Sequence, residues 1–180
     1  MPSFHDPRNA PTKQVKQLAM TALFAALCCM STMFLVIPSP TGGYMNLGDT
    51  IVLLGAYLLG PVWGAAAGGL GSALADLMAG YGMYVPATLV IKALMALLSG
   101  WLYHTLGKRI RTLPLCGVAA ELVMVIGYWH YDGFLLGNLA GSAIGIPSNL
   151  VQGIFGVAAS FLLTSALHRI PYVRQQFPAL

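Results

Sequence analysis

Long apolar segments separated by short polar connections are the dominant feature of this 180-residue sequence. Hydrophobic residues make up 57% of the chain and charged residues only 8%, whereas a soluble domain carries roughly 25% charged residues. So few charges cannot cover a surface that faces water, and the composition therefore predicts an integral membrane protein. We expect one all-α membrane domain over residues 15–168, between polar tails over residues 1–14 and 169–180.

Proline and glycine clusters divide the apolar sequence into six candidate helices. A spanning helix needs about 20 residues, because an α-helix rises about 1.5 Å per residue and the membrane core is about 30 Å thick. The second segment has only about half that length, so we expect it to be tilted, extended by flanking residues or buried by its neighbours. The six predicted ranges are 15–37, 49–59, 62–80, 86–106, 113–136 and 144–168.

The basic residues predict the orientation of these helices. Eight of the nine lysines and arginines fall into three clusters, and with six spans all three clusters lie on one side of the membrane. The positive-inside rule makes that side cytoplasmic, so both termini are expected in the cytoplasm. Such short clusters also argue against a nucleic-acid-binding patch. The eight residues are Arg8, Lys13, Lys16, Lys108, Arg109, Arg111, Arg169 and Arg174.

Lys92 is the ninth basic residue, and it interrupts the apolar stretch "TLVIKALMALL". Ionisable residues inside a membrane are costly and usually functional. Asp76 in the preceding helix has a similar predicted depth and the opposite charge, so we expect the two residues to pair. Two interpretations of Lys92 stay open, which are a neutralising partner for Asp76 and a hydrogen-bond donor in a ligand pocket.

Further polar and aromatic residues occur at a similar predicted depth, in the outer half of the bundle. They come from the stretches "ELVMVIGYWHYD" and "GIPSNLVQGIFG" and from the loop "TGGYMNLGD". Aromatic side chains with a few amide and charged groups suit a small polar ligand that contains a ring. The candidate site comprises Tyr44, Asn46, Asp76, Tyr84, Lys92, Tyr128, Asp132, Asn149 and Gln152.

Several nearby residues have simpler interpretations. Asp49 precedes the apolar run "TIVLLG", where a helix N-cap would lie, so we interpret it as a cap. Trp129 and Tyr131 suit a position at the membrane interface. His130 and Asp132 resemble part of a metal site, but a third ligand is missing, and we expect neither a metal nor another cofactor.

Small residues favour close helix packing in two segments. The third segment is rich in glycine and alanine, which let membrane helices approach one another. It does not form a nucleotide-binding loop, because the chain contains no GxxxxGK[ST] motif. The first segment carries a stripe with Ala22 and Ala26, and Ala25 lies beside it. Such a stripe is typical of either internal packing or a docking face for another membrane protein.

The motifs "NLGD", "LLGPxxGxxxGGLGSALADLxxGY", "PxTLxIKALxxxLxG", "AAELVMVIGYW" and "IPSNLVQGIFG" follow one another between residues 18 and 163. In this order they resemble the S components of energy-coupling factor (ECF) vitamin transporters, in the riboflavin-transporter-like branch. The resemblance implies a six-helix bundle that binds a vitamin from outside, beneath the loop between the first two helices. It also implies that Ala22 and Ala26 face an EcfT-like transmembrane coupling subunit, and that two separate ATPase subunits hydrolyse ATP.

The favoured function is therefore that of a high-affinity substrate-binding subunit, without catalysis of its own, in an ATP-driven importer of a bacterial cell membrane. Its expected substrate is a small water-soluble vitamin or precursor, with pyridoxine or hydroxymethylpyrimidine favoured. An S component for cobalamin, riboflavin or another vitamin is one alternative. A solitary secondary transporter with Glu121 as a proton site, and an intramembrane enzyme that uses Ser72 and Asp76, are two others.

Overall fold

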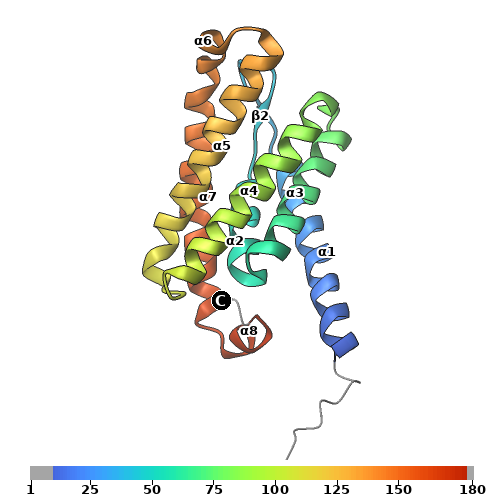
Figure 1. The fold of residues 1–180 in the computed structure, drawn as a ribbon, viewed down its shortest axis with the longest axis vertical. Helices are drawn as coiled ribbons and strands as arrows, with labels where there is room; N and C mark the ends of the chain where they lie inside the picture. Colours follow the sequence, from blue (N-terminus) through green and yellow to red (C-terminus); the bar gives the residue numbers. More distant parts are fainter. Residues whose placement is uncertain (1–9, 178–180) are drawn as a thin grey trace, which may run out of the picture.

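The computed structural model describes residues 10–177, and most of this part of the chain is helical (Figure 1). Two short helices that were not predicted, α6 (Leu139–Ser142) and α8 (Pro171–Gln176), flank the last long helix. Six other helices coincide with the six predicted segments to within one or two turns. They are α1 (Ala10–Phe34), α2 (Gly48–Leu59), α3 (Pro61–Met78), α4 (Val85–Thr105), α5 (Leu113–Leu136) and α7 (Ile146–His168).

Proline marks where most of these helices begin. A proline occupies the first turn of α3, α4, α5 and α7, where its missing N–H has no helical partner to lose and its fixed φ suits the helix. Single 3-10 turns lead into three of these helices, and each turn joins its helix without a break. The turns are η1 (Gly82–Tyr84), η2 (Ile110–Thr112) and η3 (Ala143–Gly145).

Within the described part of the chain, four segments are long and apolar enough to cross a membrane by length and composition. They are Lys13–Phe34, Gly82–Thr105, Ile110–Leu136 and Leu139–His168. The helices α2 and α3 are not among them. α2 has 12 residues, and all of them except Ile51 are buried. Of the three alternatives expected for this short element, the structure shows burial by its neighbours.

Small residues let α3 lie directly against two other helices. A Cβ atom at Gly71 would lie 2.3 Å from the carbonyl oxygen of Ala25 in α1. A Cβ atom at Gly69 would lie 2.9 Å from the carbonyl oxygen of Leu89 in α4. Both contacts are with backbone, which cannot move aside as a flexible side chain can. The glycines of the third segment therefore set the close approach of α1, α3 and α4, as the sequence predicted.

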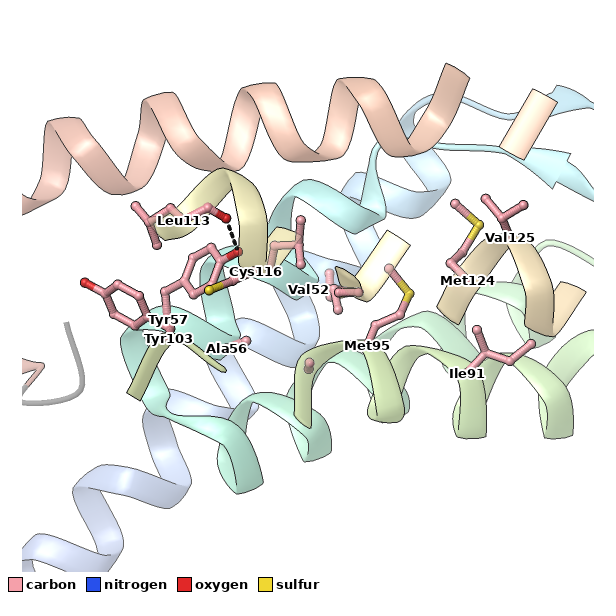
Figure 2. Close-up of a cluster of buried hydrophobic side chains, with 14 residues drawn as sticks. Val52, Ala56, Tyr57, Ile91, Met95, Tyr103, Leu113, Cys116, Met124 and Val125 are labelled. Atoms are coloured by element: carbon pink, nitrogen blue, oxygen red, sulfur yellow. Dashed lines mark hydrogen bonds between the residues drawn. The ribbon is translucent and has the colours of Figure 1, made fainter. Parts of the chain in front are cut away.

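The apolar core lies between α2, α4 and α5 (Figure 2). The rings of Tyr57 in α2 and Tyr103 in α4 lie 5.3 Å apart between their centroids. The Tyr57 hydroxyl donates a hydrogen bond of 3.2 Å to the carbonyl oxygen of Leu113, at the start of α5. Val52 and Met95 fill the adjoining layer and are completely or almost completely buried. These contacts join the short central helix to α4 and to the start of α5.

The two ends of the bundle differ in charge. Figure 1 places both described chain ends and the α4–α5 connection at one end of the molecule. Arg8, which belongs to the first predicted basic cluster, lies outside the described residues. We call this end the basic end, and its clustered cations are Lys13, Lys16, Lys108, Arg109, Arg111, Arg169 and Arg174.

A short β-hairpin lies toward the opposite end, which we call the pocket end. Its strands are β1 (Ile37–Pro38) and β2 (Tyr44–Met45), which pair antiparallel with Pro38 opposite Tyr44. Within its turn, Ser39 N–H donates to the Gly43 carbonyl oxygen at 2.8 Å. Gly42 adopts a φ of 95°, which side chains rarely allow. The sequence predicted an irregular loop here, because two-residue strands leave no periodic pattern.

Candidate functional site

A polar pocket lies beneath the hairpin at the pocket end, and all nine predicted site residues line it. The described elements that contribute to it are α1, the hairpin and its flanks, α3, η1, α4, α5 and α7. It encloses a cavity of about 30 Å³, which has room for a water molecule but not for a vitamin ring. Its lining residues are Thr32, Ser39, Thr41, Gly43, Tyr44, Asn46, Ser72, Asp76, Tyr84, Thr88, Lys92, Tyr128, Asp132, Asn149 and Gln152.

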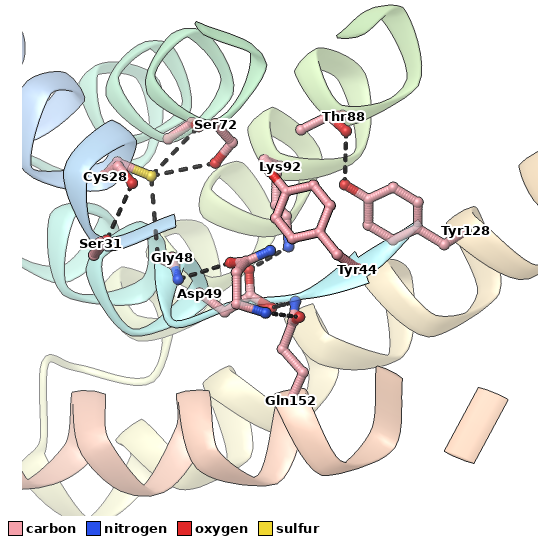
Figure 3. A network of polar contacts seen from close by, with 12 residues as sticks. Cys28, Ser31, Tyr44, Gly48, Asp49, Ser72, Thr88, Lys92, Tyr128 and Gln152 are labelled. Carbon is pink, nitrogen blue, oxygen red and sulfur yellow. Dashed lines mark hydrogen bonds and ion pairs between the residues drawn. The ribbon is translucent and has the colours of Figure 1, made fainter. Parts of the chain in front are cut away.

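Lys92 forms an ion pair with Asp49 of α2, so the predicted pair with Asp76 is wrong (Figure 3). Both side chains are almost fully buried, with exposed fractions of 2% for Lys92 and 1% for Asp49. Gln152 of α7 completes the group, because its amide nitrogen donates to the second carboxylate oxygen of Asp49 at 2.6 Å. One carboxylate therefore binds a cation from α4 and an amide from α7, which joins three helices at the floor of the pocket.

The interpretation of Asp49 as a helix cap is also wrong. α2 begins at Gly48, and its N-cap residue is Leu47, whose side chain makes no capping hydrogen bond. Asp49 thus lies inside the first turn, and its carboxylate reaches Lys92 and Gln152 instead of the free N–H groups of its own helix. A buried carboxylate needs such partners to offset the cost of removing it from water.

Asp76 receives its hydrogen bond from the hairpin. The Tyr44 hydroxyl donates to Asp76 Oδ1 at 2.5 Å, and the Tyr44 ring packs on Tyr81 with centroids 4.5 Å apart. Burial and the neighbouring Asp76 carboxyl raise the pKa of Tyr44 above its ordinary value. The hydroxyl consequently keeps its proton at neutral pH and acts as a donor. Tyr44 in this way fastens the hairpin to α3.

A wall of tyrosines forms another side of the pocket. The Tyr84 hydroxyl donates to Asp132 Oδ1 at 2.9 Å and lies 3.3 Å from the Thr41 carbonyl oxygen. The Tyr128 hydroxyl and the Thr88 hydroxyl are 2.9 Å apart. The Lys92 ammonium lies 5.4 Å from the centroid of the Tyr128 ring, within range of a cation–π interaction. Aromatic faces and charged groups therefore alternate around the cavity.

Amide groups connect the hairpin to α7. The Asn46 N–H donates to Gln152 Oε1 at 2.7 Å, and Asn46 Oδ1 accepts from the Gly48 N–H at 2.8 Å. Gln152 thus holds Asp49 with its nitrogen and the hairpin with its oxygen. Thr32 also lines the pocket, and its buried hydroxyl has no hydrogen-bond partner among the described residues. It is a donor and acceptor that a ligand could use.

Some lining residues were not predicted as part of the binding site, and Ser72 was considered only for an intramembrane enzyme. Ser72 lies four residues before Asp76 and Thr88 four residues before Lys92. This spacing places each on the same helix face as a predicted site residue, so the helical period could have identified both. Thr32 and Thr41 left no such signal. Ser72 contacts the Cys28 sulfur at 3.2 Å, which is not the contact that an enzyme using Ser72 and Asp76 would need.

The predicted docking stripe on α1 is only partly free. Ala22 and Ala26 are exposed, together with Leu23 between them. Ala25 is half-buried, because its backbone packs against Gly71 of α3. The stripe therefore serves internal packing on one side and leaves a small-residue surface on the other.

Comparison with known proteins adds three findings to this geometry. The model of a family described as "ECF-type riboflavin transporter, S component" matches residues 12–169. The "Thiamine precursor transporter HmpT" of Lactococcus lactis subsp. cremoris (strain MG1363) is 30% identical over 165 residues, which cover 87% of this chain and 90% of that protein. An "Uncharacterized protein in gap 3'region" of Pyrococcus woesei is 38% identical over 129 residues, which cover 71% of this chain and 85% of that protein.

Proposed function

We propose that this chain captures a small water-soluble vitamin or vitamin precursor for uptake, because it belongs to the family of S components of ECF-type riboflavin transporters. Members of this family are membrane-embedded transport subunits, and the apolar helices of the chain agree with that location. The observation that carries the proposal is the pocket, where nine predicted polar and aromatic residues converge around a buried ion pair.

The proposed orientation places the pocket on the outer side of a bacterial cell membrane. The clustered cations of the basic end support a cytoplasmic location of that end, and the pocket lies at the opposite end of the bundle. In this arrangement all six predicted helices contribute to the membrane domain, with both termini in the cytoplasm. The short helix α2 would stay shielded from lipid, since its neighbours bury it.

The proposed substrate is hydroxymethylpyrimidine or pyridoxine. Each is a flat nitrogen-containing ring with at least one hydroxyl group, and the pocket offers tyrosine faces for the ring and buried donors and acceptors for its edge. HmpT, to which the chain is 30% identical, is named as a transporter of a thiamine precursor, which supports the pyrimidine. The cavity of about 30 Å³ is smaller than any of these molecules, and the two small rings would require less opening of the pocket than riboflavin or cobalamin.

Entry of such a ring would require the hairpin to move. The cavity is too small for the substrate while Tyr44 donates to Asp76 and Asn46 donates to Gln152. Other polar contacts also hold the hairpin, because the Ser39 hydroxyl lies 3.2 Å from the Ser148 hydroxyl and the Tyr84 hydroxyl lies 3.3 Å from the Thr41 carbonyl oxygen. Breaking the contacts of Tyr44 and Asn46 would loosen the hairpin, and the freed Asp76 and Gln152 groups could then bind the substrate.

Delivery into the cell would depend on partner subunits. The exposed alanines Ala22 and Ala26 would dock on an EcfT-like transmembrane coupling subunit, with Ala25 contributing only its exposed part. Two ATPase subunits would supply the energy, because the chain has no nucleotide-binding motif of its own. The chain would then act as the substrate-binding part of an ATP-driven importer.

Isothermal titration of the purified protein tests the substrate proposal. The panel contains hydroxymethylpyrimidine, pyridoxine, riboflavin and cobalamin. We expect tight binding of one of the two small rings and no heat from the two large vitamins. Binding of riboflavin or cobalamin alone would overturn the choice of substrate, and no binding to any vitamin would overturn the proposed function.

Substitution of the exposed stripe tests the docking proposal. Replacing Ala22 and Ala26 with leucine should abolish uptake by the assembled transporter and leave titrated affinity unchanged. Ala166→Leu is a matched control, since Ala166 is an exposed alanine near the end of α7. Loss of binding in the Ala22 and Ala26 variant would show that the stripe serves the fold. Uptake into liposomes by this chain alone would favour the solitary transporter instead.

A further inference from the structure

Glu121 of α5 is a buried carboxyl group that the proposed substrate pocket does not use. Its exposed fraction is 5%. Neither of its carboxyl oxygens has a hydrogen-bond partner among the described residues. Buried polar groups are nearly always paired, and an unpaired one calls for a functional explanation. The group therefore differs from the other buried carboxylates, Asp49, Asp76 and Asp132, each of which accepts a hydrogen bond.

The surroundings of Glu121 leave it close to the floor of the pocket. The helix α7 faces it with Gly153 and Gly156. A Cβ atom at Gly156 would lie 2.7 Å from Glu121 Oε1 and 3.0 Å from the Cβ atom of Asp49. Glycine at this position thus lets the side chains of Glu121 and Asp49 both lie against the same point of α7. Any other residue would push them apart.

The charged and titratable groups around Glu121 come from two helices. Asp49 and Tyr57 of α2 and Lys92 of α4 interact with it electrostatically. The helix α7 faces the carboxyl group with Gly153 and Gly156, and the other α7 residues that line the groove beside it are apolar or glycine. The Lys92–Asp49 pair is already neutral as a unit. An ionised Glu121 would therefore add one uncompensated negative charge beside Asp49, in an apolar setting where such a charge is very costly.

A groove in the surface of the bundle reaches the Glu121 side chain, whose two carboxyl oxygens lie buried beneath it. It has a volume of about 400 Å³, lies between α5 and α7, and is lined by apolar residues such as Val118, Leu150 and Ile154. Glu121 is the one ionisable residue among those that line it. Both helices belong to segments apolar enough to cross a membrane, so the groove faces lipid. A small widening of the groove would thus expose the carboxyl group to the bilayer without opening the polar pocket.

We propose that Glu121 is a proton-binding site, reached from the membrane through the α5–α7 groove, that controls the Lys92–Asp49 ion pair. With a proton on Glu121, Lys92 is bound to Asp49 alone and the floor of the pocket is neutral. Without that proton, two carboxylates compete for one ammonium group, and Lys92 shifts toward Glu121. Proton loss then changes the donor that the pocket offers to a substrate. Only this last step rests on the proposed function.

A lipophilic carbodiimide tests the site without any substrate. Dicyclohexylcarbodiimide adds to protonated carboxyl groups in apolar surroundings, and the adduct is mapped by mass spectrometry of the full-length protein in liposomes. We expect an adduct on Glu121 that decreases as pH rises. A water-soluble carbodiimide should leave Glu121 unmodified, because the groove opens to lipid. Glu121→Gln removes the reactive group and serves as the assignment control.

Two variants test the coupling to the ion pair. In Asp49→Asn, Lys92 loses its partner and turns to Glu121, so labelling at fixed pH should fall about tenfold, as expected for a new opposite charge beside a carboxyl group. In Lys92→Met, the cation is gone, and labelling should persist to higher pH than in the wild type. Thr88→Val is a control in the same region that leaves all charges in place, and its labelling should match the wild type.

The outcomes separate this inference from the proposed substrate. No adduct on Glu121 at any pH, or equal labelling by the water-soluble reagent, would overturn the membrane-accessible proton site. Unchanged labelling in both Asp49→Asn and Lys92→Met would overturn the coupling. None of these readouts depends on a vitamin, so they hold even when the titration panel shows no binding. If the substrate affinity depends on pH in the wild type but not in Glu121→Gln, the proton site also controls substrate binding.

Discussion

The contact between α2 and α4 is built in two different ways along its length. At the pocket end Asp49 and Lys92 meet as a buried ion pair. Toward the basic end the two helices contribute Val52, Met95, Tyr57 and Tyr103 to one packed apolar cluster (Figure 2). Both regions are almost completely buried. An ion pair fails when either partner is lost, whereas an apolar layer loses stability in proportion to the volume removed. Single and double substitutions should therefore behave differently in the two regions.

The largest effect is expected from Lys92→Met. Removing one partner of a buried pair leaves an uncompensated charge and costs about 3–5 kcal/mol of folding stability. Adding Asp49→Asn should restore most of that loss, because both charges are then gone. Thermal unfolding of the purified single and double variants measures this. A double variant as unstable as the single one would contradict the pairing and point to packing at the pocket end as well.

Met95→Ala is the matching change in the apolar layer. Met95 is completely buried, so its truncation should cost about 3 kcal/mol through lost contacts and a cavity. No substitution among the α2 neighbours of Met95 should recover this lost stability, whereas Asp49→Asn should recover most of the stability lost in Lys92→Met. Substrate affinity should stay close to that of the wild type in titrations at a temperature where the variant is folded. A large loss of affinity would show that the two regions are not separate.

Tyr84→Phe sharpens the comparison at the pocket end. The change removes the hydroxyl that donates to Asp132, and an unsatisfied buried acceptor costs about 2 kcal/mol. We expect lower folding stability and weaker binding together, since Asp132 lines the pocket. Unfolding and titration of the same preparation give both numbers. An unchanged affinity would remove Tyr84 from the substrate site.

Tyr57→Phe is the counterpart of Tyr84→Phe near the basic end, and we expect the smallest effect from it. It removes the hydrogen bond to the Leu113 carbonyl oxygen, which should cost about 1 kcal/mol of stability. The ring contact with Tyr103 would remain, so the apolar layer should stay intact. Titration should give the wild-type affinity. Weaker binding in this variant would show that distant packing reaches the pocket.

Much of the fold was predictable because the apolar segments are long and their boundaries carry proline or glycine. The ranges of α4, α5 and α7 followed from these signals to within a turn. The close approach of α3 followed from its glycines in the same way. The hairpin strands were not predictable, since two residues are too few to show the alternating pattern of a strand.

The membership of the candidate site was predictable, but one central contact was not. Depth along the membrane normal matched Lys92 with Asp76, yet depth alone cannot decide which helix faces α4 at that level. The position of Asp49 before an apolar run predicts a helix cap, whereas its burial depends on α2 lying at the centre of the bundle. That position is a property of the packed structure, and no local pattern of residues encodes it.

An experimental structure of the protein with hydroxymethylpyrimidine bound tests the central claim most directly. We expect the ring beneath the hairpin, against Tyr84 and Tyr128, with its polar edge toward the Lys92–Asp49 pair. We also expect the contact between Tyr44 and Asp76 to be broken. A ring bound in the α5–α7 groove, or a pocket that stays closed and empty at saturating ligand, would contradict the proposed site.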